Sequence, residues 1–146
     1  MQGDFKQHNN GITSVGSLLI SKPFHTRWEY YSPDQIIINS NGSFTTYYDK
    51  DLDQSFSTFT DANITDLLYN NVQEIKNHTF FCKDNNAFLQ IERDSVAATF
   101  KFTRQPVTLE GVDIIHKENP EDITSIDFFN LQYDIPIKAS IFNNFD

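Results

Sequence analysis

Apolar and polar residues alternate with a period of two along most of the chain, and this alternation constrains the fold more than any other feature. In residues 24–31 the large side chains Trp28 and Tyr30 alternate with Arg27 and Glu29. Such alternation is typical of half-buried β-strands. Runs of this kind, separated by polar spacers, predict strands at 13–22, 24–31, 35–39, 43–49, 54–59, 78–82, 87–93, 99–104, 107–115, 123–132 and 136–142.

Two short segments predict tight turns between these strands. Asn41-Gly42 joins two β-rich runs, and an Asn-Gly step there is a strong hairpin signal. Residues 49–53 begin like a calcium loop, but Gln54 stands where the loop needs Gly and Thr60 stands where it needs a bidentate Glu. We therefore interpret 49–53 as the solvated tip of a hairpin.

Residues 61–71 break the strand pattern. Ile64, Leu67 and Leu68 follow the i, i+3, i+4 spacing of one apolar helical face, and Asp61 can cap the segment. We expect a short helix here and one antiparallel sheet elsewhere. One short helix is too little to cover such a sheet, so the sheet either curls into a barrel or half-barrel or lacks a covering piece. The whole of 1–146 is expected to be a single domain.

The charge balance excludes some classes of partner. The chain has 20 acidic and 11 basic side chains, a formal charge of -9 and a pI near 4.7. This sign is unfavourable for binding nucleic acid or anionic lipid surfaces. No run approaches the 18 or so apolar residues of a membrane span. The single cysteine, Cys82, lies in an apolar run, which predicts a buried, inert thiol.

Motifs of catalysis or metal binding are missing from the sequence. The four histidines show no paired ligand spacing, and a single cysteine cannot form a Cys-rich zinc site. There is no nucleophile elbow and no Gly-rich phosphate loop. We therefore expect no metal, no cofactor and no enzymatic activity.

The block from Gly16 to Gln54 resembles the bacterial outer-membrane lipoprotein carrier protein family, LolA. The opening residues Gly3–Gln7 look like the family's Phe-x-Gln strand start, and the order of strands is similar through residue 142. The features that carry the resemblance, in matching order and spacing, are Gly16-Ser17-Leu18, Lys22-Pro23, Arg27-Trp28-Glu29-Tyr30, Pro33-Asp34, Asn41-Gly42 and Tyr48-Asp49 through Gln54.

The resemblance implies a half-open antiparallel β-barrel with a short helical lid and an apolar cavity for the acyl chains of lipoproteins. It implies a periplasmic chaperone that takes lipoproteins from an inner-membrane lipoprotein-releasing transporter and passes them to an outer-membrane acceptor. We expect a monomer that does not itself span a membrane. By this resemblance the sequence starts where the family's first amphipathic helix would end, so we expect either a truncated chain or a gene start placed late.

The same resemblance, combined with strand alternation, predicts which residues form the site. Lys22 takes the place of the basic residue, commonly Arg, that latches the lid in the family, although lysine lacks the bidentate fork of arginine. Leu67 and Leu68 belong to the expected lid. The expected lipid-binding residues are Leu18, Ile20, Trp28, Tyr30, Ile36, Ile38 and Phe56. Each of these could equally be ordinary core.

Several other functions fit the sequence. The outer-membrane acceptor of the same superfamily is disfavoured because no lipid-attachment cysteine lies near the start. A general carrier of free lipids remains open. So does a cavity enzyme, which would need polar residues inside the cavity, and the strands offer few beyond Lys22, Glu29 and Asn39.

Overall fold

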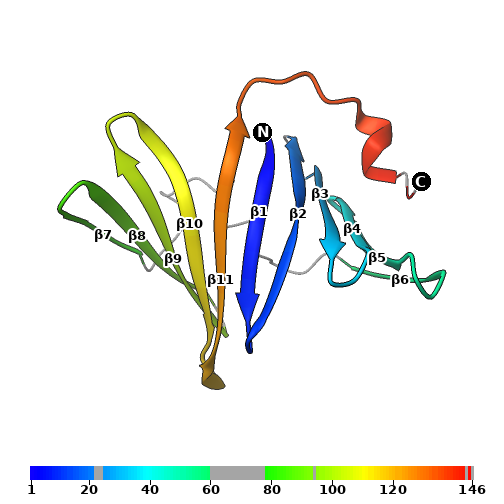
Figure 1. Ribbon diagram of the computed structural model, residues 1–146, viewed down its shortest axis with the longest axis horizontal. Coiled ribbons are helices and arrows are strands. Elements are labelled where there is room, and N and C mark those ends of the chain that lie inside the picture. The colour runs from blue at the N-terminus through cyan, green and yellow to red at the C-terminus, as the bar shows by residue number, and fades with distance from the viewer. Residues whose placement is uncertain (22–24, 60–77, 94, 144, 146) are drawn as a thin grey trace. The chain divides into compact units, whose positions relative to one another are not determined.

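The computed structural model of the chain describes residues 1–21, 25–59, 78–93, 95–143 and 145. These residues form eleven β-strands and a 3₁₀ helix (Figure 1). The strands are β1 (Gln2–Asn9), β2 (Ile12–Ser21), β3 (His25–Ser32), β4 (Ile36–Asn41), β5 (Phe44–Asp49), β6 (Gln54–Phe59), β7 (His78–Lys83), β8 (Asn86–Arg93), β9 (Val96–Arg104), β10 (Val107–His116) and β11 (Asn119–Gln132), and the helix is η2 (Ala139–Asn143).

The strands belong to a single antiparallel sheet with the order β6-β5-β4-β3-β2-β1-β11-β10-β9-β8-β7. Among the described residues β6 and β7 stand at the two ends of this order, so the sheet is not closed into a barrel. The predicted mainly β class with one open antiparallel sheet is confirmed. The helix expected at 61–71 lies outside the described residues.

The predicted hairpin turns are confirmed. Asn41-Gly42 leads from β4 into β5, and Gly42 has a φ of 92°, which only glycine adopts easily. Residues 50–53 form the turn between β5 and β6. There the Asp49 carboxylate accepts backbone N–H groups from Asp51 at 3.0 Å and Leu52 at 3.1 Å. The acidic loop is thus an Asp-stabilised turn.

The strand predicted at 136–142 is wrong, because η2 occupies most of that segment. Pro136 cannot donate to a strand ladder. The Lys138 carbonyl instead accepts the Ile141 N–H at 3.1 Å, which is a 3₁₀ spacing. The C-terminal segment therefore ends in a short helical turn.

The chain divides into two compact units, which we describe separately. Unit 1 comprises 1–5, 14–69 and 130–146, and unit 2 comprises 6–13 and 70–129. In unit 1 the aromatic ring of Phe5, which is fully buried, packs edge-on against Trp28 at 5.0 Å and Tyr30 at 4.9 Å. The core of unit 2 is aliphatic and phenylalanine-rich, with Ile91, Ala98, Phe100, Leu109, Val112, Ile126 and Phe128 buried.

Gly16 allows the Phe5 ring and the backbone of β3 to approach β2 closely. A Cβ at Gly16 would collide with the Glu29 carbonyl oxygen and lie 2.8 Å from the Phe5 ring. Gly16 pairs with Tyr30 next to a register shift at Val15. The small residue therefore lets Phe5 reach the two aromatic side chains of β3.

Candidate functional site

The strongest candidate site is a face of the sheet in unit 1. Strand pairing places Leu18, Trp28, Ile38, Tyr47 and Phe56 directly opposite one another on five successive strands. Directly opposed residues of antiparallel strands share a face. We call this set the unit 1 row. It crosses the sheet from β2 to the edge strand β6.

The other predicted lipid-binding residues lie on the same face. Ile20 is two residues from Leu18, and Tyr30 is two residues from Trp28 and pairs with Ile36. Since side chains two positions apart on a strand share a face, the structure brings all seven predicted residues together. We call this surface the unit 1 apolar face. Sequence reasoning missed Tyr47, although the Asn-Gly turn fixes its pairing with Ile38.

Burial falls off along the unit 1 row toward the edge strand. Leu18 is fully buried and Trp28 is 6% exposed, whereas Phe56 is 63% exposed. Ile38 and Tyr47 between them are half-buried. The inner residues are therefore packed core, and the outer residues offer apolar surface. Phe56 stacks on Tyr47 with ring centroids 5.3 Å apart.

The two tyrosines of the apolar face are held in the neutral form. Burial, with a smaller contribution from Tyr47, raises the pKa of Tyr30 to about 12. Burial also raises the pKa of Tyr47, helped by the negative charges of Asp49 and Asp34. Because ionised phenolates are disfavoured, this face carries no tyrosinate charge at neutral pH.

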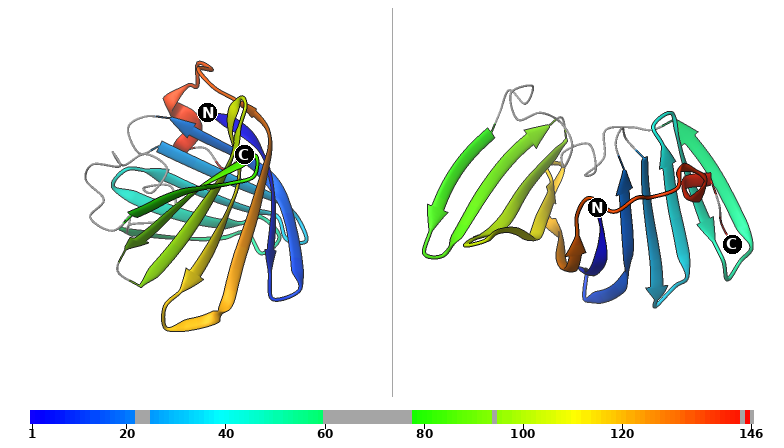
Figure 2. Two further views of the ribbon diagram at one scale, coloured as in Figure 1. Left: turned by 90° about the vertical axis from the view of Figure 1, so that its left-hand side faces the viewer. Right: turned by 90° about the horizontal axis from the view of Figure 1, so that it is seen from above.

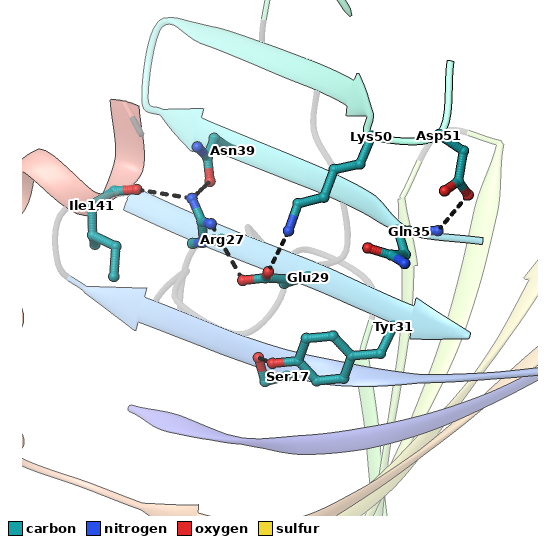
Figure 3. Close-up of polar contacts among 9 residues, drawn as sticks. All are labelled: Ser17, Arg27, Glu29, Tyr31, Gln35, Asn39, Lys50, Asp51 and Ile141. Atoms are coloured by element: carbon teal, nitrogen blue, oxygen red, sulfur yellow. Dashed lines mark hydrogen bonds and ion pairs between the residues drawn. The ribbon is translucent and has the colours of Figure 1, made fainter. Parts of the chain in front are cut away.

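The opposite face of β3 and β4 is mainly polar apart from the fully buried Ile37, and Figure 3 shows how its polar groups converge. The Arg27 side chain is only 7% exposed and contacts the Glu29 carboxylate at 3.3 Å. Lys50 approaches the other oxygen of Glu29 at 3.0 Å. Arg27 also donates to the Asn39 side-chain oxygen at 3.5 Å and to the Ile141 carbonyl at 3.2 Å. We call these residues the Arg27 cluster.

The C-terminal segment lies against this polar face (Figure 2). In addition to the Arg27–Ile141 hydrogen bond, Phe142 is buried and stacks on His25 at 5.2 Å with an interplanar angle of 26°. Phe145 packs edge-on against Tyr48 at 5.7 Å. Helix η2 thus packs on the face of β3 and β4 that is opposite to Trp28 and Tyr30.

This arrangement bears on the cavity-enzyme alternative. Glu29 and Asn39, two of its polar candidates, lie on the other face from Trp28 and are already engaged by Arg27. The third candidate, Lys22, lies outside the described residues, as do the expected lid residues Leu67 and Leu68. Within the described part of the chain, no group of three or more His, Cys, Asp or Glu side chains could hold a metal ion.

Unit 2 carries a second apolar face that sequence reasoning did not nominate. Ile126, Val112, Phe100, Leu89 and Phe80 oppose one another from β11 to the edge strand β7. We call this set the unit 2 row. In the sequence, the only pattern that indicates this row is the alternation of apolar and polar residues that predicts the strands themselves. The prediction of a buried Cys82 is wrong, because this thiol lies on the edge strand β7 and is exposed.

Comparison with known proteins identifies the family. The family model for the outer membrane lipoprotein carrier protein LolA matches residues 1–145. The chain belongs to the LolA family. Outer-membrane lipoprotein carrier proteins from Francisella tularensis subsp. novicida (strain U112) and subsp. tularensis (strain SCHU S4 / Schu 4) are each 29% identical over 147 residues, covering 94% of this chain and 70% of each relative. An uncharacterised protein of Rickettsia prowazekii (strain Madrid E) is 35% identical over 128 residues, covering 83% of this chain and 60% of that protein.

Membership of the LolA family gives the general function. The family model and the named relatives are outer-membrane lipoprotein carrier proteins, which supports a lipoprotein carrier function at the level of the family. None of the helices in the described residues has the length and apolar character needed to cross a membrane. The LolA family match and the observed open β-sheet agree with the fold that the sequence resemblance implied.

Proposed function

We propose that this LolA-family chain carries lipoproteins through the periplasm, from an inner-membrane releasing transporter to an outer-membrane acceptor. In this proposal the acyl chains bind along the unit 1 apolar face. The observation that carries the proposal is the unit 1 row, in which apolar side chains from five strands line up and become more exposed toward β6. The match to the carrier family supports it.

The energetics of acyl binding favour such a surface. Burying an acyl chain gains about 0.8 kcal/mol per CH₂ group, so a chain of roughly 16 carbons gains on the order of 10 kcal/mol before costs. A carrier must also release its cargo. A closed state that covers the face would lower the net affinity, because the free energy of opening is subtracted from that of binding.

We propose that Lys22 latches such a closed state. Lysine is a flexible point donor, so it would form a weaker latch than the bidentate arginine common in the family. Replacing Lys22 with Leu should then change lipid affinity or the timing of release, measured in a chain that carries the family's leading helix. An unchanged affinity and release profile would remove Lys22 from the mechanism.

The apolar face is tested by a release assay on spheroplasts of a Gram-negative bacterium. The purified chain is added, and a newly made outer-membrane lipoprotein is followed into the soluble fraction. Phe56→Glu places a charge on the exposed end of the unit 1 row, where binding apolar chains would require desolvating it. We expect release to fall at least about fivefold, since desolvating a charge costs more than 1 kcal/mol.

The matched control is Ser55→Glu, which adds the same charge one residue away on the other face of β6. Ser55 is exposed and pairs with Tyr48, whose side chain lies on the polar face. Release should therefore stay near that of the unmodified chain. Equal loss in both variants would argue against the apolar face. No release by any form, including one to which the family's leading helix is added, would favour a free-lipid carrier or a cavity enzyme.

A further inference from the structure

The chain contains two Asn-Gly steps, and both lie in hairpin turns. Asn10-Gly11 joins β1 to β2, and Asn41-Gly42 leads from β4 into β5. At the first turn Asn10 has a φ of 50° and Gly11 has a φ of 76°, and such positive values are typical of a two-residue type I′ turn. Asparagine and glycine are favoured at these positions because they adopt positive φ most easily.

The same dipeptide is chemically prone to deamidation. Glycine has no side chain, so its backbone nitrogen can reach the carbonyl carbon of the preceding asparagine side chain without steric hindrance. Because glycine follows asparagine in both steps, the reacting groups of the two turns are matched. A difference in their rates of deamidation in the folded chain would therefore report a difference in structure.

The Asn41-Gly42 step is held by three hydrogen bonds. The Asn41 side-chain oxygen accepts backbone N–H groups from Ser43 at 3.1 Å and from Phe44 at 3.0 Å. The Gly42 N–H, which belongs to the attacking nitrogen, donates to the Ser40 hydroxyl at 3.4 Å, and Ser40 is buried. To react, the Asn41 side chain would have to leave the turn that it stabilises. The β4–β5 hairpin thus protects Asn41.

The Asn10 side chain has no such support. It is exposed, and within the described residues it has no hydrogen-bond partner. A Cβ added at Gly11 would meet nothing within 4 Å, so the space beside this residue is open. The preceding residue, in contrast, is anchored, because the Asn9 amide donates to the Asp122 carboxylate at 2.9 Å and to the Thr124 hydroxyl at 2.6 Å. The hairpin is therefore fixed up to Asn9 and free at its tip.

We propose that Asn10 deamidates in the folded chain, whereas Asn41 is protected until unit 1 unfolds. The Gly11 nitrogen forms a bond to Cγ of Asn10 and closes a succinimide ring. The bond from Cγ to the side-chain nitrogen breaks, and this nitrogen leaves as ammonia with the proton of the Gly11 N–H. Water then opens the ring at either of its carbonyl carbons, which gives aspartate or isoaspartate. The site uses no residue of the unit 1 apolar face and does not depend on lipoprotein carriage.

The two products should affect the hairpin differently. Both add a negative charge at its tip, but only isoaspartate lengthens the main chain, by a CH₂ group. A two-residue turn sets the register of the strands that it joins. Isoaspartate should therefore displace Thr13 from His8, whose ring nitrogen Nδ1 lies 3.0 Å from the Thr13 hydroxyl. Deamidation would thus mark an aged chain by a local change in unit 2.

The test compares the two Asn-Gly steps within the same molecule. The purified chain is incubated in mildly alkaline buffer, and circular dichroism verifies that it stays folded. Peptides that contain Asn10 or Asn41 are followed by mass spectrometry, which detects the gain in mass when an amide becomes an acid. Asn10 should react at least about tenfold faster than Asn41, because the hydrogen bonds at Asn41 must break first. In a urea concentration that unfolds the chain, the two rates should become similar.

Two variants assign the signals. Asn10→Gln lengthens the side chain, so that attack by the Gly11 nitrogen would have to close a larger and less favourable ring. This variant should lose the modification in the first peptide and keep the unmodified rate in the second. Asn41→Gln is the matched control, and it should leave the rate at Asn10 unchanged in folded chain.

Three results would overturn the proposal. Equal rates at Asn10 and Asn41 in the folded chain would show that the hydrogen bonds do not protect Asn41. An Asn10 that reacts in urea but stays unchanged in buffer would show that the tight turn itself protects it. A difference in rate that persists in urea would assign the difference to the neighbouring residues in the sequence and not to the structure.

Discussion

The two units build matching rows of apolar side chains, and the rows differ at their outer ends. In both, burial is greatest on the inner strands and decreases outward, to 63% exposure at Phe56 in unit 1 and 62% at Phe80 in unit 2. In unit 1, Tyr47 fills the space beneath Phe56 by stacking on it. In unit 2, Cys82 and Ala87 beside the row are small, and a cavity remains.

The comparison shows that one strand pattern can yield two kinds of surface. A large aromatic residue one strand in from the edge gives a filled apolar face, and small residues in register give a hollow one. The sheet faces opposite the two rows differ as well. Unit 1 buries the Arg27 cluster beneath η2, whereas the Lys101–Glu110 pair of unit 2 has side-chain exposures of 48% and 38%.

The largest effects should come from truncating an inner member of each row. Leu18→Ala in unit 1 and Phe100→Ala in unit 2 should each cost about 3 kcal/mol or more, because they leave cavities in packed core. Phe56→Ala and Phe80→Ala should each cost less than about 1 kcal/mol. The measurement is urea unfolding followed by circular dichroism. Similar losses of unfolding free energy at the inner and outer positions would contradict the decrease in burial along both rows.

A smaller effect should distinguish the Arg27 cluster of unit 1 from the Lys101–Glu110 pair of unit 2. Arg27→Met leaves the Glu29 carboxylate, which is 21% exposed, without its buried partner, and should destabilise the chain by about 2 kcal/mol. Lys101→Met, in the exposed pair of unit 2, should change the free energy of unfolding by less than about 0.5 kcal/mol.

A double variant identifies the cause of the Arg27 effect. Adding Glu29→Gln to Arg27→Met removes the carboxylate that has lost its buried partner and keeps only Lys50, so the double variant should regain part of the lost stability in the same urea unfolding measurement. If the double variant is instead less stable than Arg27→Met alone, the remaining Glu29–Lys50 pair stabilises the chain by more than the half-buried charge costs.

A further effect is a pH dependence that should mark the unit 1 apolar face and not the unit 2 row. The pKa of Tyr30 is raised to about 12 from an ordinary value of 10, so ionisation favours the unfolded chain. The stability that neutral Tyr30 contributes is complete below pH 10 and is lost as the pH rises toward 12. At about pH 11 the loss should be about 1 kcal/mol. The unit 2 row has no titratable side chain.

Tyr30→Phe tests this dependence. The variant should lose less stability than the unmodified chain between about pH 9 and pH 11. Urea unfolding followed by the fluorescence of Trp28, the only tryptophan, provides the measurement next to the site. Parallel pH profiles for the two chains would show that another group controls alkaline unfolding.

Much of the fold followed from the sequence because each strand carries its own alternation. The turn at Asn41-Gly42 and the alternation in β2, β3, β4 and β6 together place Leu18, Trp28, Ile38 and Phe56 on one face. These are local signals. Each turn and each alternating strand can be recognised from a window of only a few residues.

The errors involve long-range partners. Residues 136–142 alternate like a strand, but η2 is held by Arg27 and His25, which lie more than a hundred positions away. Cys82 has apolar neighbours in sequence, but it is exposed because β7 ends the strand order. The unit 2 cavity depends on Cys82 and Ala87 meeting across two strands. No local pattern specifies these contacts.

The placement of Trp28 in unit 1 and Cys82 in unit 2 has a practical consequence. Each is the only residue of its type in the chain, so an acceptor dye on Cys82 forms an energy-transfer pair with Trp28 without any mutation. The transfer efficiency then reports the separation of the two units in solution. Following it while an acyl ligand is added would test whether the separation of the two units changes on binding.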